Sequence, residues 1–452
     1  MTPVVEKLGT AVDDWVSTNN SRLVALRRHL HAHPELAFAE FETTSFLEQQ
    51  LRNVGLNPRR LPTGTGLVCD VGSGNPVVVL RADIDALPLA DLKDVAYAST
   101  RDGLCHACGH DVHTSVVLGV AMALAGLDGL PGRVRCIFQP AEETVPGGAT
   151  EVVASGVLDG ASRAFAVHCD PSVPAGKIGL RTGPITAACD RIDITLLGPG
   201  GHTARPQLTV DLVDALGRLI TDIPALLSRQ VDPRAGMSLV WGAVNAGIAA
   251  NAIPQRGHLR GTVRVLDREA WHGAEDLLRS LVERVAATTG AEVDVDYIRG
   301  VPPVVNDPRA VALLRSAALE TVGSDRLVLS PQSMGGEDFG WFADVMPIAL
   351  ARLGTHGGGA PLDLHRGTFD VDEQAIGIGV RLLARTALHA LEADAAPARS
   401  GRPAPGDTSA RRAVDERREP HDELHRQARG HRPPGCRAGT PGCRGAGRAR
   451  GA

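Results

Sequence analysis

The sequence predicts an α/β fold in which a mostly parallel sheet is covered by helices and carries an inserted α+β domain. Continuous apolar segments such as residues 76–80 alternate with helical patterns such as residues 112–125, which is typical of a parallel sheet buried on both faces. Near Thr186 the pattern changes, because apolar and polar residues alternate over residues 192–196, as in a strand with one solvated face. The 452-residue length also favours more than one domain.

The same patterns predict each element in chain order. In the first part we expect helices over residues 23–30, 42–53 and 112–125 and strands over 76–80, 134–138 and 164–167. In the inserted part we expect strands over 192–196, 238–244, 257–265 and 292–297 and helices over 210–227 and 268–288, which make a small four-stranded antiparallel α+β unit. The first part then resumes with a helix over 307–321, a strand over 347–353 and a helix over 371–391.

Three parts are therefore expected. A discontinuous main domain covers residues 1–185 and 302–394, and the inserted domain covers 186–301. Residues 395–452 are rich in Arg, Gly and Pro and lack apolar periodicity, so we expect a disordered tail. We favour a dispensable extension, and the alternative is a basic tail that binds a partner.

Composition excludes several classes of function. The net charge of −5 does not favour a nucleic-acid partner, and no apolar run approaches the roughly 20 residues of a membrane span. The first 18 residues lack the basic and apolar regions of a signal peptide, which indicates a cytoplasmic protein. The eight cysteines are scattered, and in a reducing cytosol they are expected to be packing residues or metal ligands.

The segment 104–113 (LCHACGHDVH) is dense in possible metal ligands. Cys and His suit zinc and related transition metals, and Cys108 and His110 would point to the same side of an extended stretch. Gly109 lets the loop bend around an ion. A competing interpretation takes Cys105 and Cys108 as a redox pair or as half of a structural zinc site, although no second CxxC stands in the folded part.

Acidic and histidine side chains follow three predicted strands. Asp83 and Asp85 follow the first, Glu142 and Glu143 the second, and His168 and Asp170 the third. An isolated acidic pair is by default a solvated turn, but ligand sites in α/β sheets form where strands end, and here the pattern repeats. One of two adjacent glutamates can bind metal while the other faces substrate and transfers a proton during hydrolysis.

In motif order the sequence resembles the M20 metallopeptidases, specifically the amidohydrolase branch that includes hippurate, N-acyl-amino-acid and auxin-conjugate hydrolases. The resemblance covers about residues 20–390 and is carried by these motifs: 28–36 (RHLHAHPEL), 81–88 (RADIDALP), 106–111 (HACGHD), 139–143 (QPAEE), 201–202 (GH), 251–254 (NAIP), 261–264 (GTVR) and 337–339 (EDF).

The resemblance implies a zinc-peptidase-like catalytic domain with a ferredoxin-like lid that also dimerises. It implies two divalent ions (Zn, Mn, Co or Ni) with the ligands Cys108, His110, Glu143, His168 and His365. It also implies Glu142 as general base and acid, with Asp83 at the catalytic centre, and His202 as the group that polarises the scissile carbonyl, reaching across a dimer. Asn251 and Arg264 would hold the substrate carboxylate, for which Arg is well shaped.

Two positions depart from the family pattern. Cys105 stands where this branch usually has Met, and its thiol could compete for metal or oxidise with Cys108. Arg366 and Gly367 stand where the family has Ser and Pro after the histidine, and we expect Arg366 to shift substrate preference or metal affinity.

The expected function is hydrolysis of a small N-acyl amino acid by metal-activated water in a homodimer or dimer-based tetramer, with no nucleic acid and no membrane partner. The alternative within the family is a dipeptidase or carboxypeptidase. A non-catalytic binding protein would be expected to lack Glu142 or some ligands, and all are present. A thiol redox protein would leave the Glu and His positions unexplained.

Overall fold

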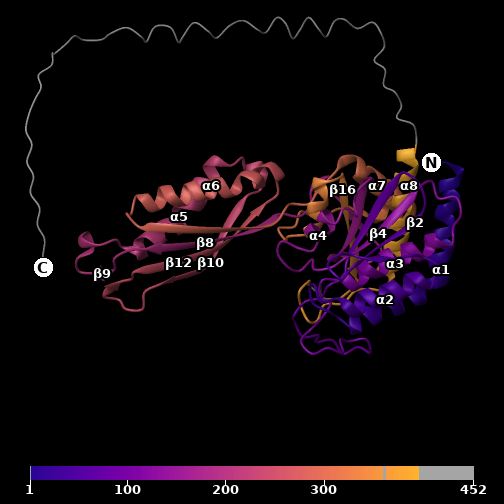
Figure 1. Ribbon diagram of the computed structural model, residues 1–452, viewed down its shortest axis with the longest axis horizontal. Helices are drawn as coiled ribbons and strands as arrows, with labels where there is room; N and C mark the ends of the chain where they lie inside the picture. The colour runs from indigo at the N-terminus through magenta and orange to yellow at the C-terminus, as the bar shows by residue number, and fades with distance from the viewer. Residues whose placement is uncertain (1, 360–362, 396–452) are drawn as a thin grey trace, which may run out of the picture. The chain divides into compact units, whose positions relative to one another are not determined.

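The computed structural model describes residues 2–359 and 363–395, with elements labelled as in Figure 1. Its largest sheet has eight strands in the order β1-β2-β4-β3-β5-β16-β6-β15. In that order the strands are Arg59–Arg60, Leu67–Gly72, Arg133–Gln139, Val77–Asp83, Ala161–Pro174, Ile348–His356, Ile178–Leu180 and Leu327–Leu329. The four central strands, β4, β3, β5 and β16, are parallel, as predicted.

The flanks of this sheet differ from the prediction, because β1, β2 and β6 pair antiparallel with their inner neighbours. These strands and β15 were not expected from the sequence. Most of them are too short to give a clear apolar pattern. Strand β5 is also longer than expected, so His168 lies inside it rather than after its end.

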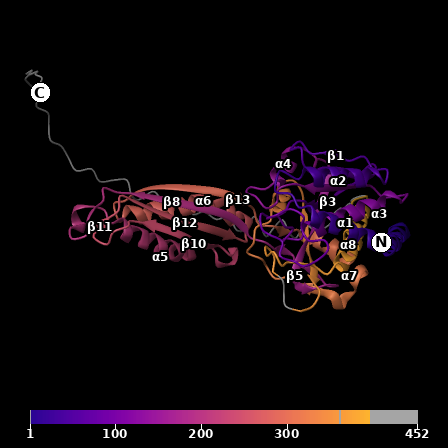
Figure 2. The same cartoon turned by 90° about the horizontal axis from the view of Figure 1, so that it is seen from below.

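Helices cover both faces of the large sheet. Helices α1 (Pro3–Ala32), α3 (His110–Ala125), α7 (Pro308–Val322) and α8 (Gln374–Ala395) pack together on one face, and Figure 2 shows α1, α3 and α8 side by side. Val78 and Leu80 of β3 belong to the core on this face, whereas Val79 belongs to the opposite core. The uninterrupted apolar run of β3 is explained by this double burial.

The remaining elements of this part are shorter. Helix α2 (Phe41–Arg52) packs near α3 and β2, while α4 (Ala149–Ala154) contacts the 3-10 helix η4 (Asp338–Asp344). Strands β7 (Gly183–Pro184) and β14 (Val305–Asn306) form a separate pair, and η3 spans Ser324–Arg326. No helix within the described ranges is both long and apolar enough to cross a bilayer.

The second sheet has four antiparallel strands in the order β10-β12-β8-β13. They are Ser238–Ala246, Arg256–Val265, Ala188–Leu197 and Glu292–Val301, and helices α5 (Leu212–Gln230) and α6 (Arg268–Ala287) lie against them (Figure 1). This β-α-β-β-α-β order is ferredoxin-like, as expected. The buried Ile192, Ile194 and Leu196 contribute to a core of its own.

Side-chain caps fix where the helices of this part begin. The carboxylate of Asp211 accepts backbone N–H bonds at the start of α5, and that of Asp267 does so at the start of α6. The remaining elements of this part are short. They are the paired strands β9 (Gly201–His202) and β11 (Ala252–Ile253) and the 3-10 helices η1 (Pro206–Leu208) and η2 (Pro233–Ala235). The domain boundaries at 186 and 301 stay a prediction, and the expected tail lies outside the described residues apart from Ala395.

Candidate metal centre

A glycine turn separates Cys108 from His110. Helix α3 begins at His110, and Gly109 precedes it with φ of +88°. A Cβ atom at Gly109 would lie 2.7 Å from Cys169 Sγ, so only glycine fits. The extended stretch expected here is therefore wrong: the chain makes a left-handed turn at Gly109, and a helix begins at His110.

Two groups of ligand atoms meet at Glu143. The possible ligand atoms of Cys108, Glu143 and His365 lie within 4.8 Å of one another, and so do those of His110, Glu142 and Glu143. His168 adjoins the first group, with Nε2 3.6 Å from Cys108 Sγ. Two overlapping groups that share one carboxylate are the arrangement expected for two neighbouring ions.

Hydrogen bonds behind these side chains set their orientation. His110 Nδ1 lies 2.9 Å from the carbonyl oxygen of Asp85, and Asp85 Oδ2 accepts the backbone N–H of Glu143 at 2.9 Å. His168 Nδ1 lies 2.7 Å from the carbonyl oxygen of Cys169. Each histidine thus donates Nδ1–H backwards and keeps the Nε2 lone pair for the centre, as metal-binding histidines usually do.

The donor atoms of His110 and Glu143 make no hydrogen bond within the described chain, although His365 Nε2 lies 3.3 Å from Glu143 Oε1, and this is the test of whether ions fit. His110 Nε2 and Glu143 Oε1 are buried without a hydrogen bond from any described residue. His110 Nε2 lies 3.7 Å from Glu142 Oε2 and 3.8 Å from Glu143 Oε1, too far for hydrogen bonds. Buried polar atoms are rarely left unpaired, and Cys, His and Glu donors suit zinc and related ions. These residues therefore fit divalent metal.

The surroundings of the site shift the pKa values of Glu142 and His110. Burial, together with the nearby Glu337, Asp338 and Glu143, raises the pKa of Glu142 well above its usual range. A carboxyl group with a raised pKa can hold a proton near neutral pH. Burial alone would lower the pKa of His110, but Asp83 and Cys108 oppose it and raise that pKa well above the usual value.

A cavity of about 340 Å³ opens in front of these residues. Cys108, Glu142, Glu143, His168 and His365 all line it. Two arginines, Arg264 and Arg352, line the same cavity, and Arg264 also donates to the carbonyl oxygen of Met334 at 3.1 Å.

Comparison with known proteins identifies the family. Residues 79–389 match the model described as peptidase family M20/M25/M40. The chain belongs to this family. The resemblance expected from the motifs and the zinc-peptidase-like fold class are thereby confirmed, and the protein is a hydrolase of the M20 type.

Three relatives illustrate the match. N-acetyl-L-cysteine deacetylase of Bacillus subtilis is 37% identical over 365 residues, which cover 80% of this chain and 86% of that protein. The B. subtilis YxeP protein, described as a dinuclear metal-binding peptidase of the M20 family, superposes with a TM-score of 0.74 at 34% identity, over 83% of this chain and 99% of that one. A Rhodococcus jostii protein named as a glutamate–cysteine ligase is 46% identical over 379 residues, which are 83% of this chain but only 48% of that protein.

Asp83, expected at the catalytic centre of this M20 protein, lies behind the cavity rather than on its wall. Its two oxygens lie 2.7 Å from His113 Nδ1 and 2.7 Å from an Arg81 nitrogen, and the side chain is fully buried. His113 Nε2 in turn accepts the backbone N–H of Cys169, so both of its nitrogens are used. His113 is therefore not free to bind metal.

His202 and Asn251 are not brought to the cavity of this M20 chain. Both are exposed and lie at the β9–β11 pair, where the N–H of Thr203 donates to the carbonyl oxygen of Asn251. Neither residue lines the cavity, whereas Arg264 does. Within one chain the structure thus assembles the proposed ligands, Glu142 and Arg264, but not His202 or Asn251.

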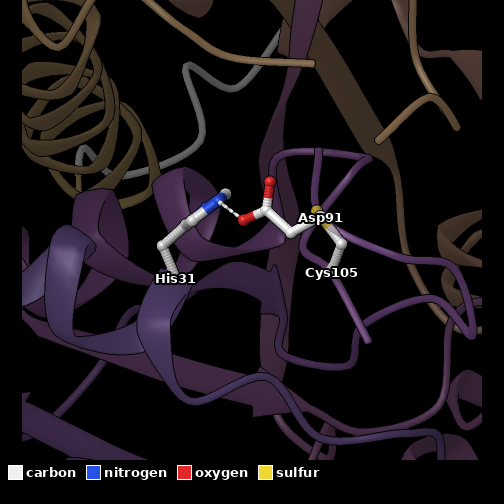
Figure 3. A group of neighbouring side chains, drawn as sticks. All are labelled: His31, Asp91 and Cys105. Atoms are coloured by element: carbon white, nitrogen blue, oxygen red, sulfur yellow. Dashed lines mark ion pairs between the residues drawn. The ribbon is translucent and has the colours of Figure 1, made fainter. Parts of the chain in front are cut away.

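Cys105 belongs to a different cluster from Cys108. It lies with His31 and Asp91, and Figure 3 shows the ion pair between these two, with Asp91 Oδ2 3.3 Å from His31 Nε2. Lys93 Nζ lies 2.7 Å from Asp91 Oδ1 and 3.8 Å from Cys105 Sγ. Burial disfavours a charged His31, but Asp111 and Asp91 raise its pKa to about 10. Two cations already fill this cluster, which favours an ion-pair network over a further metal ion.

Arg366 is exposed and does not line the cavity, although its neighbour His365 does. Its expected influence on substrate or metal stays a prediction.

The residue that the sequence interpretation missed is Arg352. The available signal was an arginine inside the otherwise apolar segment 348–353 (IALARL), because a charged side chain is rarely buried without a partner.

Proposed function

We propose that this M20 hydrolase cleaves the amide bond of N-acyl amino acids, with Glu142 as general base and then general acid. The observation that carries this proposal is the position of Glu142: it lines the cavity together with Glu143, and its Oε2 lies 3.7 Å from the buried Nε2 of His110, which has no hydrogen bond from any described residue. The relative named N-acetyl-L-cysteine deacetylase supports the same reaction type.

The roles of the residues follow from their positions. Cys108, His110, Glu143, His168 and His365 would hold two divalent ions, which lower the pKa of bound water. Glu142 would take a proton from the attacking water and pass it to the amine nitrogen as the C–N bond breaks. Its position on the cavity wall beside Glu143 suits both transfers.

Asp83 would position the site rather than react. It fixes His113, which bonds the backbone of Cys169 next to His168. Arg264 would hold the α-carboxylate of the substrate, since it reaches the cavity from β12. His202 and Asn251 would complete the site of a partner subunit in a homodimer, because both are exposed away from the cavity of their own chain.

The test compares Glu142→Gln with Glu143→Gln. Glu142→Gln should keep both metal ions and lose about a hundred- to ten-thousand-fold in kcat, because only proton transfer is removed. Glu143→Gln should lose metal as well. Metal content by mass spectrometry and kcat on N-acetyl-L-methionine separate the two effects.

Chelation should abolish activity, and added divalent metal should restore it. Activity that is indifferent to chelators, or a Glu142→Gln enzyme that keeps its rate, contradicts the proposal. A screen of acetyl-, benzoyl- and indoleacetyl-amino acids beside dipeptides distinguishes an amidohydrolase from the dipeptidase or carboxypeptidase alternative.

A further inference from the structure

Arg352 is a buried cation without a counter-ion. Its side chain belongs to β16, is 8% exposed and lines the candidate active-site cavity. The other buried arginines of the described chain are each paired with carboxylates: Arg27 with Asp111, Arg81 with Asp83 and Asp338, and Arg135 with Asp70. No hydrogen bond or ion pair joins the Arg352 guanidinium to another described residue. Buried charges are almost always paired, so a partner from outside the chain is indicated.

The fold gives Arg352 its place beside the metal ligands. Arg352 and His168 stand opposite each other on the parallel strands β16 and β5, so their side chains project from the same face. On the other side, β6 offers Gly179, where an added Cβ would lie 3.1 Å from Arg352 Cβ. Glycine therefore leaves room for the arginine. Burial and the charge of Arg352 together lower the pKa of His168.

The other charges of the cavity are already accounted for. Glu337 lies 3.2 Å from Arg81, and Glu143 lies 3.3 Å from His365. Glu142 is assigned to proton transfer. Arg264 donates to a carbonyl oxygen and is assigned to the substrate α-carboxylate. The guanidinium of Arg352, which lines the cavity together with His168, is the positive charge that remains without a partner among the described residues.

We propose that Arg352 binds a second carboxylate of the substrate, so that the preferred substrates are N-acyl amino acids with two anionic groups. This rests on the proposed function, in which Arg264 takes the α-carboxylate. The second carboxylate belongs either to an acidic side chain of the amino acid or to a dicarboxylic acyl group. A guanidinium matches a carboxylate with two parallel hydrogen bonds, and Lys would match it less well.

The experiment compares kcat/KM for three substrates. N-acetyl-L-glutamate carries the second carboxylate on the amino acid, N-succinyl-L-methionine carries it on the acyl group, and N-acetyl-L-methionine lacks it. The wild-type enzyme should prefer one of the two diacids over N-acetyl-L-methionine. Arg352→Met should lower that preference about ten- to hundredfold, mostly through KM, because a charge-assisted pair is lost. Arg352→Lys should restore part of it.

Arg326→Met is the matched control, because Arg326 is exposed and outside the cavity, and it should leave the substrate ratios unchanged. Equal ratios in wild type and Arg352→Met, or a wild-type enzyme without preference for either diacid, overturn the proposal. If Arg352→Met does not fold, the wild-type preference and the Arg352→Lys ratios decide.

Binding separates this proposal from the proposed function. Calorimetric titration of the metal-loaded Glu142→Gln protein with N-acetyl-L-glutamate, N-succinyl-L-methionine and N-acetyl-L-methionine measures the contribution of the second carboxylate without turnover. Tighter binding of one diacid, lost on adding the Arg352→Met change, supports the arginine even if amide hydrolysis proves to be the wrong reaction. Equal binding of all three counts against it.

Discussion

Glu40 is a buried carboxylate that holds the turn in front of Glu142. Its Oε1 accepts the backbone N–H of Ala141 at 2.8 Å and that of Phe38 at 3.0 Å. Ala141 and Phe38 both have φ of +59°, a left-handed conformation that costs energy in a residue other than glycine. Glu40 thus stabilises the strained backbone that aims Glu142 into the cavity.

Glu40→Gln should change how stability depends on pH. Burial raises the pKa of Glu40 to about 7, so the folded protein keeps this proton after the unfolded chain has lost it. The raised pKa of Glu40 therefore leaves the free energy of unfolding unchanged below about pH 4.5 and lowers it by about 3 kcal/mol above pH 7. Because Gln does not ionise, the stability of the variant relative to wild type should rise by about this amount between pH 4 and pH 8.

Chemical denaturation at both pH values measures the difference. Glu151→Gln is the control, because Glu151 is exposed and its replacement should leave the pH dependence as in wild type. A pH dependence that is the same in wild type and Glu40→Gln would show that Glu40 ionises normally.

Among the elements, α3 depends on the glycine before its first residue. Gly109→Ala should lower the free energy of unfolding by about 2 kcal/mol or more, because a left-handed alanine is strained and its Cβ meets Cys169 Sγ. It should also weaken metal binding, since Cys108 and His110 flank the turn. Denaturation and metal analysis give the two readouts.

The other end of the same helix provides a control. Gly126 has φ of −89°, and a Cβ there would meet no atom within 4 Å. Gly126→Ala should therefore stay within about 0.5 kcal/mol of wild type and keep its metal. Equal effects of the two alanines would mean that the turn at Gly109 adapts.

How far the sequence predicted each element depended on burial. Strand β3, buried on both faces, and β8, with one face towards its core, gave clear patterns and were placed correctly. The two-residue β1 and the three-residue β6 and β15 gave none, because pairing with neighbouring strands rather than their own composition makes them strands.

The residues of the candidate site also differed in how well the sequence predicted them. Cys108, His110, Glu142 and Glu143 stand in dense local motifs, so the sequence pointed to them directly. His365 came only from the resemblance. Arg352 escaped notice because its meaning depends on the register that sets it beside His168 and on Gly179 in another strand, and neither is written in the segment itself.

At the scale of the whole molecule, the position of His202 predicts that active sites are shared between subunits. His202→Ala alone should lose about a hundred- to a thousandfold in kcat if this side chain stabilises charge on the scissile carbonyl. Under the proposed function, Glu142→Gln should be inactive for a separate reason, the loss of proton transfer. Mixing the two inactive proteins should restore about a quarter of wild-type activity, because half of the dimers are mixed and each carries one intact site.

Subunit exchange and the rate of N-acetyl-L-methionine hydrolysis provide the measurement. A mixture of Glu142→Gln with Glu143→Gln is the control and should stay inactive, because both changes fall on the same side of the proposed interface. If the first mixture also stays inactive while exchange is complete, His202 does not act across a dimer.

The four-stranded sheet is entered on β8 and left on β13, and these two strands run side by side, with Cys189 opposite Val301. The chain therefore enters and leaves the four-stranded sheet on neighbouring strands. An insertion with adjoining ends can be acquired, trimmed or exchanged during evolution without rerouting its host. His202, Asn251 and Arg264 all lie in this segment, so under the proposed function an exchange of the segment would change substrate recognition and leave the proposed metal ligands in place.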